Sequence, residues 1–252
     1  MKVGDKSLYF HVRHYQNNNT LGKVEHITSS IINANRTGIK LGFEPQCISN
    51  FKTQLSYYSE FNNVPVMATV LTSDGEVDKL SINQIMMIED VCPVESLRIH
   101  EAISYYRDVL RNPFPEDYVK EILAYAKSRK LSVFWNEWDW RAFPQIAKMI
   151  ERYEDTVIVS FGTNANYIEP SDAYQKYLQQ FKRKGASVQS WYWFERNNRK
   201  SGTEMLMPPE LMRLHAREAF QAGCELVQFE PYWYFFKNIK KLPSLEVIGE
   251  KI

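Results

Sequence analysis

Six consecutive residues, WNEWDW at 135–140, place two carboxylates among three indoles directly after an apolar stretch. Indoles beside acids suit the binding of a sugar, because the C–H face of the ring stacks on the aromatic plane while an acid contacts a hydroxyl or donates a proton. The same pattern is also consistent with indoles that fill a core beside a surface acid. We therefore ask whether the pattern recurs in the chain.

Carboxylates do recur at the ends of the predicted strands, and four of them have apolar or aromatic neighbours. These carboxylates are Glu44 and the four with apolar or aromatic neighbours, Glu101, Glu137, Glu195 and Glu230. A carboxyl group in an apolar setting has a raised pKa and can act as a general acid, while one in a wetter setting stays ionised and can act as a base. Such a pair is the arrangement of glycoside hydrolysis. We predict Glu137 as the acid, Glu195 or Glu230 as the base, and Glu101 as an alternative for either role.

Further polar and aromatic residues at the same predicted strand ends would hold the substrate. Sugar platforms are expected from Trp135, Trp138, Trp193 and Trp233, and contacts to hydroxyls from Tyr192, Tyr232, Asn136, Asn164 and Arg98, with Asp139, Glu44 and His100 beside them. His100 could bind substrate or only orient its neighbour Glu101.

The elements that must position these residues alternate between strand and helix along the chain. Strands are predicted at 7–12, 38–45, 64–73, 96–104, 131–140, 156–166, 187–196 and 224–236. Helices are predicted at 23–38, 49–60, 78–91, 115–130, 141–155, 170–185 and 208–223, with a short closing helix in the tail to Ile252. Eight such units in about 250 residues predict an α/β fold, a single (β/α)8 TIM barrel over residues 1–252. A doubly wound open sheet is less favoured, because HVRHYQNNNT after the first strand has no glycine for a phosphate-binding turn.

Composition narrows the classes of partner. The net charge is +1, which gives no electrostatic reason to expect nucleic acid or an anionic membrane. The three cysteines lack metal-type spacing, so neither a zinc site nor a disulfide framework is predicted, and no cofactor is expected. The start MKVGDKSLYF has no apolar core of a signal peptide, which favours a cytoplasmic or phage-associated protein. The sequence leaves the oligomeric state open.

The segments WNEWDW, SWYWFER and AGCELVQFEPYWYFF, within eight barrel units, resemble the catalytic barrel of glycoside hydrolase family 98. That family comprises endo-acting enzymes that cleave galactosidic linkages in complex glycans with inversion. The resemblance implies a TIM barrel, a metal-free mechanism with two carboxylates, and an oligo- or polysaccharide as the substrate.

Two other functions fit parts of the pattern. A metal-dependent barrel phosphodiesterase would gather His11, His14, Glu44 and Glu101 around a divalent ion. A non-catalytic glycan-binding barrel would use the acids only to hydrogen-bond sugars. Sensitivity to a chelator separates the first from a glycosidase, and turnover of an oligosaccharide separates the second.

Overall fold

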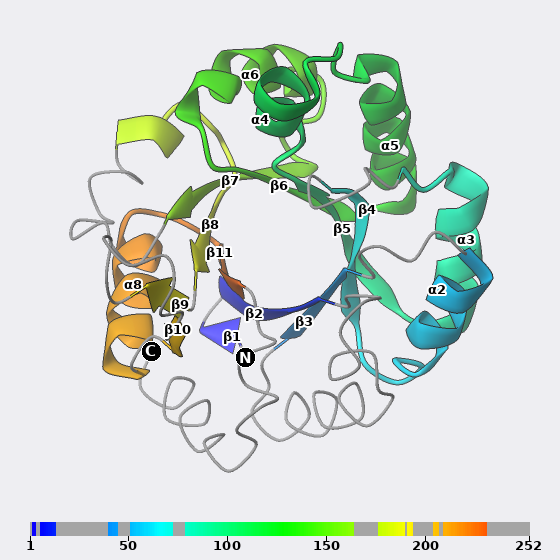
Figure 1. Ribbon diagram of the computed structural model, residues 1–252, viewed down its shortest axis with the longest axis horizontal. Coiled ribbons are helices and arrows are strands. Elements are labelled where there is room, and N and C mark those ends of the chain that lie inside the picture. The colour runs from blue at the N-terminus through cyan, green and yellow to red at the C-terminus, as the bar shows by residue number, and fades with distance from the viewer. Residues whose placement is uncertain are drawn as a thin grey trace.

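The fold is that of a curled parallel sheet with helices on its outer side (Figure 1). The structure is a computed structural model that describes residues 2–3, 6–13, 40–44, 51–72, 79–163, 176–189, 191–193, 204–206 and 209–230. The predicted α/β class and its TIM-barrel-like curl are therefore confirmed at the level of the sheet.

The strands of this sheet are β1 Lys2–Val3, β2 Lys6–Arg13, β3 Lys40–Glu44, β4 Val66–Leu71, β5 Val94–His100, β6 Ser132–Glu137, β7 Val157–Thr163, β8 Lys184–Gln189 and β11 Leu226–Glu230. Their order is β1-β2-β11-β8-β7-β6-β5-β4-β3, with a further pairing between β2 and β3. All pairs are parallel except β1 with β2. Parallel strands share one direction, so their carboxyl ends lie at one edge of the sheet.

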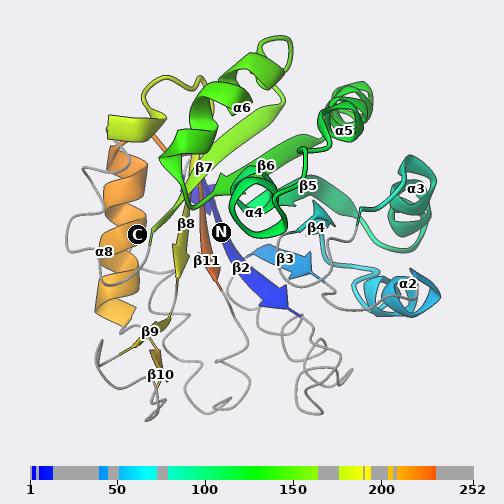
Figure 2. The ribbon, with the colours of Figure 1, turned by 45° about the horizontal axis from the view of Figure 1, so that its top comes forward.

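The described helices follow strands and lie outside the ring, as the turned view also shows (Figure 2). They are α2 Phe51–Ser59, α3 Ile82–Val91, α4 Ala102–Tyr105, the π-helix η1 Tyr106–Leu110, α5 Glu116–Arg129, the 3-10 helix η2 Trp140–Ala142, α6 Phe143–Ile150 and α8 Pro209–Gln221. Within the described ranges, none of these helices combines the length and the apolar character needed to cross a membrane.

Side chains that alternate along each strand belong to two separate buried clusters, one on each face of the sheet. Leu97, Ile99, Val133 and Trp135 belong to a large cluster that also holds the apolar residues of α3, α5 and α6, so this face of the sheet packs on the helices. The residues between them face the inside of the curl, where a smaller cluster consists of Tyr9, Met67, Phe134, Ile158 and Leu226. Successive side chains of a strand point to opposite faces, which explains the separation.

The structure corrects two predicted strands. The strand expected at 96–104 ends at His100, and α4 begins at Ala102. The strand expected at 187–196 begins earlier, at Lys184, and ends at Gln189.

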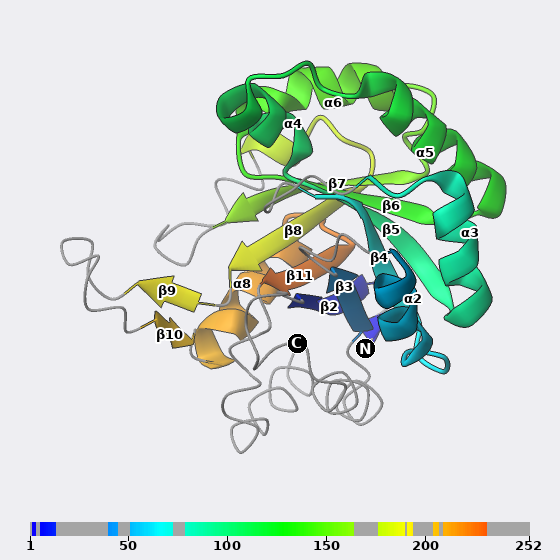
Figure 3. The same cartoon turned by 45° about the vertical axis from the view of Figure 1, so that its right-hand side comes forward.

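The next residues form β9 Trp191–Trp193, which pairs antiparallel with β10 Glu204–Leu206 in a separate two-stranded ribbon. Figure 3 shows this ribbon apart from the curled sheet. Trp191, Tyr192 and Trp193 therefore belong to this ribbon and not to the curled sheet. The helix predicted at 23–38 lies outside the described residues.

Candidate functional site

A band of buried polar side chains lines the inside of the curled sheet. It consists of Thr69, Arg98, His100, Asn136, Ser160, Ser187 and Gln228, each at most 5% exposed. On β4, β6, β7 and β11 the band residue comes two positions after a member of the inner apolar cluster, toward the carboxyl end of the strand. Barrel interiors are usually filled by branched apolar residues, so this polar band marks the candidate site.

The inner apolar cluster forms the floor beneath the band. A methyl group added at Gly185 would come within 2.7 Å of Phe134 Cε2 and 3.0 Å of Ile158 Cγ2, so the floor closes tightly over this glycine. The band therefore rests on packed apolar side chains, and its polar groups are removed from bulk water on that side.

The two polar atoms of the Asn136 side chain differ: the oxygen accepts a hydrogen bond, and the nitrogen has no hydrogen-bond partner among the described residues. Ser160 Oγ donates to Asn136 Oδ1 over 3.1 Å, which leaves the Nδ2 group as a donor. Nδ2 is buried, and among the residues that the structure describes it has no hydrogen-bond partner; the same holds for Thr69 Oγ1. Burying such groups without a partner costs roughly 1–3 kcal/mol each, which a ligand acceptor would offset.

His100 and Glu101 lie side by side in the candidate site. His100 Nε2 lies 3.4 Å from Glu101 Oε1, with the imidazole fully buried and the carboxylate 23% exposed. Glu101 adopts a left-handed backbone conformation with φ of 51°, and its amide donates to Asn136 O over 2.7 Å. Strained conformations of this kind gather at functional sites, where the surrounding structure holds them.

Glu137, predicted as the general acid, lies on the helix-facing side of β6. It shares that face with Trp135, as the alternation of residues predicts, but the face packs against α4 and not into the curl. Its carboxylate accepts hydrogen bonds from Ile103 N (2.9 Å), Ser104 N (3.2 Å), Ser104 Oγ (2.6 Å) and Trp135 Nε1 (3.2 Å). Complete burial raises the pKa of Glu137 to about 7, and the donors of Ser104, Ile103 and Trp135 limit the rise.

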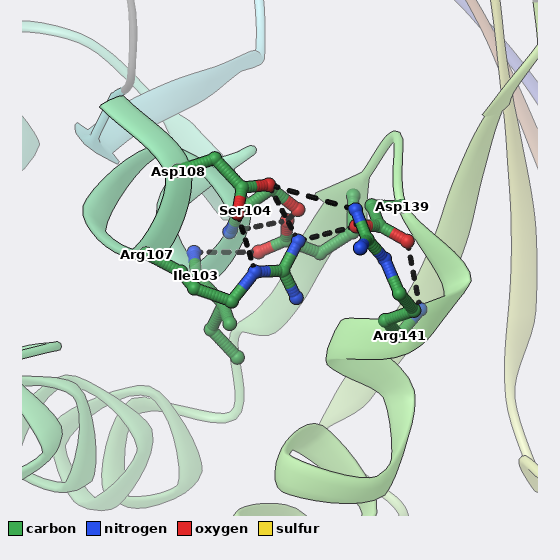
Figure 4. A network of polar contacts seen from close by, with 7 residues as sticks. Ile103, Ser104, Arg107, Asp108, Asp139 and Arg141 are labelled. Atoms are coloured by element: carbon green, nitrogen blue, oxygen red, sulfur yellow. Dashed lines mark hydrogen bonds and ion pairs between the residues drawn. The ribbon is translucent and has the colours of Figure 1, made fainter. Parts of the chain in front are cut away.

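Asp139 is held in an ion-pair network at the rim (Figure 4). It accepts from Arg141 N (2.9 Å) and Arg141 Nε (2.7 Å) and pairs with Arg107 of η1. Arg107 also contacts Asp108 through two nitrogens, at 2.8 and 2.6 Å. Burial would raise the pKa of Asp139, but the guanidinium donors outweigh it and hold that pKa below its ordinary value.

The three indoles of the first motif lie in different settings. Trp135 is fully buried and stacks on Phe114 at 6.1 Å, so it is a core residue and not a sugar platform. Trp138 is 46% exposed, and Trp140 is 50% exposed and stacks on Tyr177 at 5.6 Å.

The structure gathers Arg98, His100, Glu101 and Asn136 of the predicted site. It places Glu137 on the opposite face of β6 and Asp139 in the ion-pair network of Arg107 and Arg141. Other predicted residues cannot be placed: Asn164, Glu195, Tyr232, Trp233 and His14 lie outside the described residues, and for His11, Glu44, Tyr192, Trp193 and Glu230 only the strand positions are described. Of the described residues, no three of His, Cys, Asp or Glu are grouped so that they could hold a metal.

Sequence reasoning missed Thr69, Ser160, Ser187 and Gln228. For Thr69, Ser160 and Gln228 the available signal was their position within largely apolar predicted strands, since polar residues in a buried strand require partners. Ser187 gave no such signal, because it begins the strand predicted at 187–196.

Comparisons with known proteins identify the fold and no family. No family model matches the chain, and no curated protein matches it. The solved structure of Xanthomonas albilineans dihydropteroate synthase, in complex with indole-2-carboxylic acid and 6-chloroguanine, is similar with a TM-score of 0.56 at 10% identity, covering 96% of this chain and 92% of that chain. A likeness at this identity shows a shared fold alone.

The resemblance to glycoside hydrolase family 98 was wrong, and so were the predicted glycosidase activity and the oligo- or polysaccharide partner. Dihydropteroate synthase, which shares the fold, is a protein of a different family. The physical reason lies in the motif that suggested sugars, because Glu137 and Trp135 belong to the sheet–helix core.

Proposed function

We propose that this chain is a barrel enzyme that binds a small polar molecule inside the curled sheet and transfers a proton on it with His100 and Glu101. The polar band is the observation that carries the proposal. Six neighbouring strands each contribute a buried polar side chain above an apolar floor. These side chains lie on the side of the floor toward the carboxyl ends of the strands, where barrel enzymes hold their substrates.

The donors of the band indicate a ligand with hydrogen-bond acceptors. Asn136 Nδ2 has its hydrogens directed away from Ser160, and Arg98 adds a permanent positive charge on the neighbouring strand. A carbonyl, a ring nitrogen or an anionic oxygen would match these groups. His100 is the residue type whose unperturbed pKa lies nearest neutrality, and Glu101 can orient it and balance its charge.

The wider architecture belongs to the same proposal. We propose a complete (β/α)8 barrel in a single domain over residues 1–252, since the pairing of β2 with both β11 and β3 supports closure of the sheet. Glu44 and Glu230 end β3 and β11, which supports their place at the same rim. The site roles predicted for Asn164, Glu195, Tyr192, Trp193, Tyr232 and Trp233 stay predictions.

Ligand binding tests this function. The purified chain would be screened by thermal shift and calorimetry against purine and pteridine bases, 6-chloroguanine among them, against small carboxylic acids and against phosphate monoesters. We expect one class to bind, and Asn136→Ala to weaken its binding about 10-fold or more, equivalent to about 1.4 kcal/mol. Asn63→Ala is the matched control, since that exposed amide contacts only its neighbour Asn62 among the described residues. Equal binding by both variants would contradict the proposal.

Turnover of the bound compound separates an enzyme from a binding protein. His100→Gln removes the titrating group and should lower the rate about 100-fold or more while binding remains, the usual scale for losing general acid–base catalysis. A rate unchanged in His100→Gln would remove His100 and Glu101 from the chemistry.

A further inference from the structure

We infer that Glu137 is a positioning residue, which caps helix α4 from the neighbouring strand and thereby holds Glu101 beside His100. The inference rests on the proposed function in treating Glu101 and His100 as site residues. It assigns Glu137 a role that differs from the acid role predicted from sequence.

The start of α4 needs an external cap. The first amides of a helix have no partner within it, and a side chain of the N-cap residue usually accepts from one of them. Here the N-cap residue is Glu101, and its side chain makes no capping hydrogen bond. Glu137 takes this place from β6, accepting from the amides of Ile103 and Ser104 and from the Ser104 hydroxyl.

Because Glu137 caps α4 in place of Glu101, the Glu101 carboxylate lies next to His100. Glu101 has a left-handed backbone, which is unfavourable for a residue with a side chain and therefore needs support from the surrounding structure. Three backbone hydrogen bonds clamp the turn from β6: Asn136 O accepts from the Glu101 amide, and the Glu137 carboxylate accepts from the amides of Ile103 and Ser104. Consecutive residues of one strand therefore hold both sides of the turn.

The alternative role, a general acid at Glu137, requires access to a substrate. The Glu137 side chain has no exposed surface, and both of its oxygens accept protein donors. The geometry therefore places its effect on the site in the turn that it fixes.

The test reads the site directly and needs no ligand. The full chain would be labelled at histidine, and the His100 imidazole signals would be assigned by NMR with His100→Gln. Glu101→Gln should shift these signals, and Glu137→Gln should shift them in the same direction. Ser104→Ala, which removes one donor and leaves the carboxylate in place, should give a smaller shift in that direction. If Glu137→Gln does not fold, Ser104→Ala provides the test in its place.

The matched control is Ser81→Ala, which removes the cap of α3, where Ser81 Oγ accepts from Gln84 N over 3.3 Å. It should lower the stability of the fold, as loss of a helix cap does, without moving the His100 signals. His100 signals that stay at their wild-type positions in Ser104→Ala and in folded Glu137→Gln would overturn the inference. His100 signals that move as far in Ser81→Ala as in Ser104→Ala or Glu137→Gln would also overturn the inference. Because the readout contains no ligand, failure of the ligand screen would not produce either result.

Discussion

At the scale of single residues, Glu137 should make the stability of the fold depend on pH. Its pKa is about 7 in the fold, against an ordinary value of 4.5, so the folded state binds more protons than the unfolded state between these values. The free energy of unfolding should therefore fall as pH rises through this window, by about 3 kcal/mol in total. Urea denaturation at pH 5 and pH 8 measures the loss.

Glu137→Gln supplies the comparison for that measurement. The amide cannot ionise, so the variant should lose less stability than the wild type between the two pH values. At pH 5 it should already be less stable by about 1–3 kcal/mol, because its NH2 group faces donors. An identical pH dependence in both proteins would show that the carboxyl group does not titrate in this range.

Asp139 should contribute to stability through the two guanidinium groups at the rim. Asp139→Asn removes the charge that Arg107 and Arg141 share, at a side chain only 5% exposed, and should lower the free energy of unfolding by about 2–3 kcal/mol. Asp117→Asn is the control, because the Asp117 side chain is fully exposed and its contact with Lys120 is 3.4 Å long; the expected change is under about 0.5 kcal/mol. Similar losses in both variants would show that burial of the network adds nothing.

At the scale of elements, the two inner glycines of β7 and β8 offer a matched pair. An added methyl group at Gly185 meets Phe134 at 2.7 Å, whereas at Gly162 its nearest contact is 3.6 Å away. Gly185→Ala should therefore cost about 1–3 kcal/mol of stability by overpacking the floor, and Gly162→Ala should stay within about 0.5 kcal/mol. Thermal and urea denaturation of both variants would measure this, and equal effects would show that the floor can relax.

Much of the element order could be predicted from the sequence, because apolar runs separated by amphipathic segments indicate both period and type. Alternation also predicted that Glu137 shares a face with Trp135. It could not show which face this is, since both faces of a barrel strand are buried and both read as apolar. The polar band was missed for the same reason: Ser160 and Gln228 look like interruptions until the curl brings them together.

Local propensity also explains the misplaced strand ends. Among the residues after His100, the β-branched Ile103 suits a strand, which agrees with the prediction of a strand that continued to 104. The structure turns at Glu101 because α4 is capped by a residue 36 positions later, and a contact between segments so far apart is absent from any local pattern.

At the scale of the whole molecule, Arg183 ties together three parts of the amino-terminal edge of the sheet. Its guanidinium pairs with both oxygens of Glu225, at 2.8 and 3.0 Å, and donates to Ser132 Oγ and Asp155 O. Arg183→Ala should lower the free energy of unfolding by about 1–2 kcal/mol, because a bidentate pair with further bonds exceeds an ordinary surface pair.

The adjacent Lys182 provides the comparison for Arg183. It pairs with Asp155 at 2.6 Å, but both side chains are more than half exposed. Lys182→Ala should change stability by less than about 0.5 kcal/mol in a urea denaturation series. A loss as large as that of Arg183→Ala would mean that net charge, and not the clamp, sets the stability of this edge.

The capping of α4 from another strand also constrains how the chain can evolve. When a helix is capped by its own N-cap residue, that residue can be substituted without a compensating change elsewhere in the protein. Here a change at 137 would leave the amides of Ile103 and Ser104 without that acceptor, and the turn that carries Glu101 would lose its support from β6. Homologues should therefore either conserve positions 101, 104 and 137 together or substitute them together. An alignment of homologous sequences would reveal this covariation.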